Sequence, residues 1–153
     1  MAKAQPVDLD PFAPFGEAAR KIIAVRGGEL FEHSEGVLDT SDIERVHDMR
    51  VATRRLRAAL EVFSDAFPKS ELKPVLRDVK ALADALGERR DPDVHIEEFT
   101  KLREGLAEAD QPGVDLLLES LLDEQARGNE TLARTLDEMS ASDLRGRLEA
   151  LAS

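Results

Sequence analysis

Apolar residues recur every three or four positions along most of this chain, the spacing of amphipathic α-helices packed on a core. The clearest case lies in residues 41–67, where one side of the helical wheel is apolar: Met49, Ala52, Leu56, Ala59, Leu60, Phe63 and Phe67. Thr40, Ser41 or Asp42 can cap this helix, and Glu44 has capping-box spacing from Ser41. The helix should stop near Phe67 and Pro68.

The same periodicity predicts helices over residues 15–33, 70–86, 93–109 and 114–139, and a short one to about residue 151 after a cap at 140–142. Gly87 should stop the third helix, and Asp91 with Pro92 should start the fourth. Gly27 and Gly28 weaken the first helix, and could mark a close helix approach or a kink. We expect an all-α fold, a helical bundle of five or six antiparallel helices.

The domain organisation should be simple. Pro6, Pro11 and Pro14 discourage helix near the start, so residues 1–10 should be a flexible lead and residues 11–153 one helical domain. The chain has 0 Cys, 0 Trp, 0 Tyr and 6 Phe, so no disulfide forms and the core must be mainly aliphatic. We find no secretory signal and no apolar run of the ~20 residues that a membrane span needs. We therefore expect a soluble cytoplasmic protein.

A second stripe lies opposite the apolar one on the helix of residues 41–67. It consists of His47, Arg50, Arg54 and Arg57, at steps of three, four and three, with Arg55 on its flank. Lys73, Arg77 and Lys80 form a similar basic stripe on the next helix. Neighbouring arginines repel one another, so such a row suggests a bound anion.

Charge is distributed unevenly along this chain of net charge −11. Residues 45–90 carry 11 basic and 7 acidic side chains, whereas residues 91–153 carry 6 basic and 16 acidic ones. Most of the surface should therefore repel nucleic acid and anionic membranes. A polyanion would have to bind in the middle third.

Arginine suits phosphate because its planar fork donates two parallel hydrogen bonds and stays charged. A helix that presents one such group on each turn matches a linear ligand with a charge at each repeat. The alternative is a solvated face neutralised by the acidic helices of the same chain. Neither a GxxxxGK[ST] loop nor a GxGxxG loop is present.

His47 could donate to a phosphate oxygen, act as a proton-linked switch, bind a metal, or simply bond a neighbouring carboxylate or carbonyl. The three histidines, His33, His47 and His95, lack metal-site spacing, so we expect no metal and no cofactor. Asp91 and Asp93 could form a catalytic acid pair. We expect instead that Asp91 caps a helix and that one of these acids orients a basic side chain. With no nucleophile elbow, we expect no enzyme.

Two motifs in this order resemble the CHAD family, the conserved-histidine α-helical domains. The first is VHDMRVATRRLRAALEVF, at residues 46–63, and the second is LGERRDPDV, at residues 86–94. The resemblance covers about residues 12–151 and matches the first of the two similar helical halves of that family's domain. Pro92 stands where the family more usually has an apolar residue.

The resemblance implies a non-catalytic domain that binds inorganic polyphosphate in a basic groove or pore, with association with polyphosphate granules. It implies that His47, Arg50, Arg54 and Arg57 are primary ligands, joined by Arg55 and Arg90. Lys73, Arg77 and Lys80 are added from the helical wheel.

Because the resemblance covers only the first half of that domain, we predict a homodimer in which two arginine helices face a shared groove. The alternative function is an interaction or dimerisation scaffold whose basic helix docks an acidic partner. A phosphohydrolase or accessory metal site is a weaker alternative. Nucleic acid is a poor candidate, since aromatic stacking residues are scarce.

Overall fold

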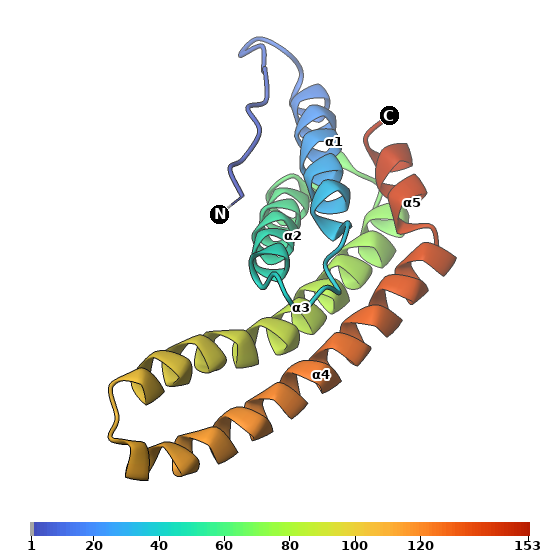
Figure 1. The fold of residues 1–153 in the computed structure, drawn as a ribbon. Helices are drawn as coiled ribbons and strands as arrows, with labels where there is room; N and C mark the ends of the chain where they lie inside the picture. Colours follow the sequence, from blue (N-terminus) through green and yellow to red (C-terminus); the bar gives the residue numbers. More distant parts are fainter. Residues whose placement is uncertain (1) are drawn as a thin grey trace.

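The computed structural model describes residues 2–153, and within this range the regular secondary structure consists of helices, with no strand (Figure 1). The α-helices are α1 (Phe15–Ser34), α2 (Glu44–Val62), α3 (Lys69–Glu104), α4 (Gln111–Ala141) and α5 (Leu144–Leu151). Two short 3₁₀ helices, η1 (Ser64–Ala66) and η2 (Glu108–Asp110), follow α2 and α3. The predicted all-α fold is confirmed. None of these helices combines the length and apolar character needed to cross a bilayer.

The helices form a small bundle with a long projecting arm. Antiparallel α1 and α2 pack on each other, α2 packs on α3, and α5 lies beside α1 and α3 (Figure 1). Helices α3 and α4 make an antiparallel hairpin whose far half projects beyond the bundle (Figure 1). The predicted apolar side of α2 does face the core, since Met49, Ala52, Leu56 and Leu60 are at most 1% exposed. The opposite face of α2 is thereby left for polar side chains.

Helix α3 differs from the prediction, because it runs unbroken through both residues expected to interrupt it. Gly87 does not stop it, and Asp91 with Pro92 does not start a new helix. Proline lacks the N–H that would bond the carbonyl four residues earlier, which normally ends or kinks a helix. Here the pair Arg89 Nη1 to Asp93 Oδ1, at 2.5 Å and one turn apart, spans the proline. Packing against α4 covers the same turn, so tertiary contacts override the local signal.

The helix caps also differ from those expected. Ser41 forms no capping box, because its N–H and hydroxyl both donate to Asp39. None of the three candidate residues is the N-cap of α2, which is Ile43 and makes no side-chain cap hydrogen bond. Asp42, just before it, accepts from the N–H of Glu44 at 3.2 Å. The cap of α5 is Asp143 rather than residues 140–142. Asp143 has left-handed backbone (φ 52°) and accepts from the N–H of Gly146.

The segment before α1 runs along α1 and α2 without helix over its described residues, 2–14 (Figure 1). Ala2 is buried; its N–H donates to Asp48 Oδ1 at 2.7 Å, and its carbonyl accepts from Arg55 at 3.0 Å. Gln5 bonds to the buried carboxylate Glu29 of α1. These contacts place the segment against the bundle, and the flexibility expected of residues 1–10 stays a prediction.

Candidate functional site

Helix α2 presents three arginines to a groove on the side away from its buried face. Arg50, Arg54 and Arg57 line a groove of about 560 Å³ between α2 and α3. These residues are at i, i+4 and i+7, so they lie on one face, about 10 Å apart from first to last at ~1.5 Å rise per residue. The central part of the predicted basic stripe therefore does converge on one concave surface.

The opposite wall of the groove belongs to α3 and is lined by Ala83, Asp84, Gly87, Glu88 and Asp91. Gly87, expected to stop a helix, lies instead in this wall. A β-carbon there would meet no atom within 4 Å, so Gly87 has open space before it. The small side chain of Ala83 lies one turn earlier on the same wall. Together these two residues leave space between the arginines and the backbone of α3.

The three arginines differ in how they are neutralised. Arg57 pairs with Glu61 one turn along α2, at 3.1 Å. Lys80 of α3 approaches the same carboxylate, at 3.7 Å, so Glu61 links one end of the groove across the two helices. Among the described residues, Arg50 and Arg54 have no hydrogen bond and no carboxylate oxygen within 4.0 Å. Two guanidinium groups of the groove are thus available to an anion.

His47 lies on the same side of α2, one turn before Arg50, and is partly buried. It does not line the groove described above. Glu44, His47 and Asp48 each offer a ligand atom, and these atoms lie within 4.8 Å of one another. The expectation of no metal rested on spacing between histidines, and so did not weigh this single-helix group. Asp48 is already engaged, because it accepts the N–H of Ala2.

The other predicted ligands lie away from the groove's centre. Arg55 is on the flank of α2 and donates to the carbonyl of Ala2. Arg90 is partly buried, and its Nη1 atom is buried with no hydrogen-bond partner. Lys73 is exposed near the start of α3 and has no ion pair within the described residues. The structure thus gathers Arg50, Arg54 and Arg57, joins Lys80 to them through Glu61, and separates the rest.

Arg77 points to a different partner from the rest of its stripe. It pairs with the adjacent Asp78 at 3.1 Å, and Asp78 also accepts a 2.5 Å hydrogen bond from Arg147 of α5. Partial burial acts to raise the pKa of Asp78, but hydrogen bonds from Arg147 and Arg77 outweigh it and hold that pKa below its ordinary value. This end of the stripe therefore helps to dock α5.

A buried polar network holds α3 to α4 beside the groove. Arg89 and Asp93 are at most 1% exposed and pair with each other. Asn129 of α4 accepts from Arg89 at 3.1 Å and donates to the carbonyl of Leu38, while Gln125 donates to Asp93. The expectation that one acid of this segment orients a basic side chain is met by Asp93. The α4 partners have no short-range sequence signal.

The sequence interpretation also missed the acids on the groove wall. Asp84, Glu88 and Asp91 repeat at i, i+4 and i+7 on α3, with the same spacing as the arginines that face them. The spacing of these three acids is visible in the sequence, but the sequence does not show which faces of α2 and α3 lie opposite each other. Asp91, expected as a cap, is an exposed member of this row.

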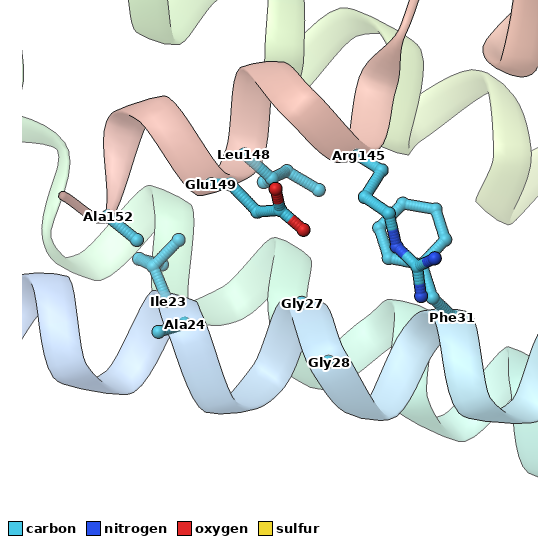
Figure 2. Close-up of a pocket in the computed structure, with 9 residues that line it drawn as sticks. All are labelled: Ile23, Ala24, Gly27, Gly28, Phe31, Arg145, Leu148, Glu149 and Ala152. Atoms are coloured by element: carbon cyan, nitrogen blue, oxygen red, sulfur yellow. The ribbon is translucent and has the colours of Figure 1, made fainter.

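A separate pocket of about 240 Å³ lies between α1 and α5 (Figure 2). It contains Gly27 and Gly28, where a β-carbon would meet nothing within 4 Å, so these glycines mark open space and not a close helix approach. The guanidinium of Arg145 stacks over Phe31 at 4.7 Å at one end (Figure 2). None of the predicted ligand residues lines this pocket.

The CHAD domain family model matches residues 21–153, most of the chain. CHAD domains are associated in general with polyphosphate binding and are generally non-catalytic. No curated protein and no solved structure matched the chain.

Proposed function

The chain belongs to the CHAD domain family, and from this premise we propose that it binds inorganic polyphosphate, without catalysis, along the groove between α2 and α3. The observation that carries the proposal is the pair Arg50 and Arg54, which line the groove and have no partner among the described residues. Leaving two guanidinium groups side by side costs repulsion that a bound anion would relieve. A row of cations about 10 Å long favours an extended ligand over a single phosphate.

The ligand contacts follow from the position of each cation. Arg50 and Arg54 bind first, and Arg57 and Lys80 join once the ligand displaces Glu61. His47 extends the row at the start of α2. The remaining basic residues are proposed as outer contacts for a longer chain: Arg55, Arg90, Lys73 and Arg77. Binding in the cytoplasm at polyphosphate granules is the setting that this function predicts.

The test is a calorimetric titration of the protein with polyphosphate of defined length. Arg50→Glu with Arg54→Glu should abolish binding while the circular dichroism spectrum stays helical. Arg127→Glu with Arg134→Glu, two exposed positions on α4, is the matched control. Each Arg→Glu change subtracts two charges, so both double variants move the net charge from −11 to −15. Equal binding by the two variants would place the ligand elsewhere.

A second candidate function is an interaction scaffold, and the projecting arm favours it. Leu102, Leu116 and Leu122 lie on the far half of the α3–α4 hairpin and are at least 50% exposed. Leucines that are half exposed or more on a projecting arm offer apolar surface to a partner protein. We propose that the chain forms a homodimer through this arm. The other dimer arrangement, predicted from the sequence, in which two arginine helices face a shared groove, stays a prediction.

A further inference from the structure

The groove has two walls of opposite charge. Arginines of α2 form one wall, and three exposed acids of α3, Asp84, Glu88 and Asp91, contribute to the other. None of these acids has an ion pair or hydrogen bond through its side chain among the described residues, although arginines line the same groove. The walls are therefore separate surfaces with space between them, not a closed set of salt bridges.

A bare polyanion would be attracted by one wall and repelled by the other. A phosphate chain on Arg50 and Arg54 would turn its outer oxygens toward Glu88 and Asp91 across the groove. Like charges that face each other across the groove oppose binding unless something neutralises them. Divalent cations do this, because Mg²⁺ binds hard oxygen ligands and is typically held by one or two carboxylates together with substrate phosphates.

We propose that the groove binds polyphosphate as its divalent-cation complex, with Mg²⁺ bridging the phosphate oxygens to the carboxylates of α3. This inference rests on the proposed function and names the form of the ligand. The cation arrives with the polyphosphate. In the chain alone, the carboxylate oxygens of Asp84, Glu88 and Asp91 do not all lie within 4.8 Å of one another, whereas the possible ligand atoms of Glu44, His47 and Asp48 do. The arginine wall binds the phosphate groups. The acidic wall favours polyphosphate whose charge is partly neutralised by Mg²⁺ over metal-free polyphosphate.

The experiment measures polyphosphate affinity by calorimetry at fixed ionic strength, with millimolar Mg²⁺ or with a chelator. For a purely cationic groove, Mg²⁺ competes for phosphate and weakens binding. If Mg²⁺ bridges polyphosphate to the acids of α3, it should instead strengthen polyphosphate binding by about tenfold, an ordinary coupling between two ligands. The chain alone should show no Mg²⁺ binding through these acids.

The deciding variant is Asp84→Asn with Glu88→Gln and Asp91→Asn, which keeps side-chain size and removes the negative wall. It should bind metal-free polyphosphate more tightly than the parent chain, and Mg²⁺ should weaken that binding. The control, Glu119→Gln with Asp123→Asn and Glu124→Gln, removes the same charge from exposed positions on α4 and should keep the tenfold gain. Circular dichroism checks that each variant is helical.

The outcomes separate the two proposals. If the parent chain does not bind polyphosphate either with or without Mg²⁺, the proposed function itself is contradicted. Binding that Mg²⁺ weakens in the parent chain overturns only the cation bridge. Enhancement by Mg²⁺ that persists in the Asp84, Glu88 and Asp91 variant also overturns it, because the cation would then act elsewhere.

Discussion

Gly128 of α4 packs directly on the backbone of Arg89 in α3. A β-carbon at Gly128 would lie 3.1 Å from the Cα of Arg89 and 3.2 Å from the carbonyl oxygen of Glu88. That carbonyl is the one that Pro92, four residues later, leaves without its helical N–H donor. The closest approach of the two long helices therefore falls at the turn of α3 that the proline weakens.

This contact predicts that Gly128→Ala destabilises the chain by about 1–3 kcal/mol, because the added methyl group forces α4 away from α3. Denaturant unfolding followed by circular dichroism measures the change. Gly113→Ala is the control, because a β-carbon at that exposed position of α4 meets nothing within 4 Å. It should be neutral or stabilising by up to about 1 kcal/mol. Equal effects at both positions would contradict the close packing.

Removing Asp93 from the buried Arg89–Asp93 pair should lower the free energy of unfolding more than Gly128→Ala does. Asp93→Ala leaves the guanidinium of Arg89, which is 0% exposed, without its carboxylate. Uncompensated buried charge destabilises by about 3–5 kcal/mol. Asp115→Ala, which breaks the exposed pair of Asp115 with Arg103, is the comparison and should cost far less. If the unfolding curves of the two variants coincide, the polar network beside Pro92 contributes little to stability.

The same turn shows what could and could not be predicted from the sequence. Periodicity located the segments of the α-helices, because local spacing decides which face of a helix is apolar. It did not predict the 3₁₀ helices η1 and η2, nor the end of α3 at Glu104. It divided α3 wrongly at Gly87 and Pro92, because the contacts that keep the helix continuous come from Gly128 and from the Arg89–Asp93 pair. The arginine row was readable within one helix. The acidic wall facing it depends on how α2 packs on α3, which residue spacing alone does not determine.

Docking of α5 should weaken in acid. Hydrogen bonds from Arg147 and Arg77 hold the pKa of Asp78 below its ordinary 3.8 despite opposing partial burial. A lowered folded-state pKa contributes stability that is present above 3.8 and is lost as pH falls through the folded value. The stability difference between the parent chain and Asp78→Asn should therefore be largest near neutral pH and shrink below 3.8. A difference that is constant across this range would contradict the pairing.

Glu61 should act as an internal competitor of the ligand, because it pairs with both Arg57 and Lys80. Glu61→Gln should raise polyphosphate affinity by up to about fivefold, the scale of a surface ion pair. It should also steepen the fall of affinity with salt, by ~0.7 in log–log slope for each further phosphate neutralised. Glu130→Gln, an exposed change of equal charge on α4, is the control. Equal gains from both variants would indicate a general charge effect.

The projecting arm predicts a dimer that depends on leucine contacts. Light scattering at micromolar concentration should give twice the mass of the 16.9 kDa chain, and high salt should not dissociate the dimer, because apolar burial does not weaken with ionic strength. Leu116→Lys with Leu122→Lys should yield monomers. Ala126→Lys with Ala141→Lys adds the same charge at exposed positions of α4 and should leave the dimer intact. Dissociation of the parent chain in high salt would instead favour docking of the basic helix on acidic surface. A parent chain that is monomeric and still binds polyphosphate tightly would show that one copy is sufficient.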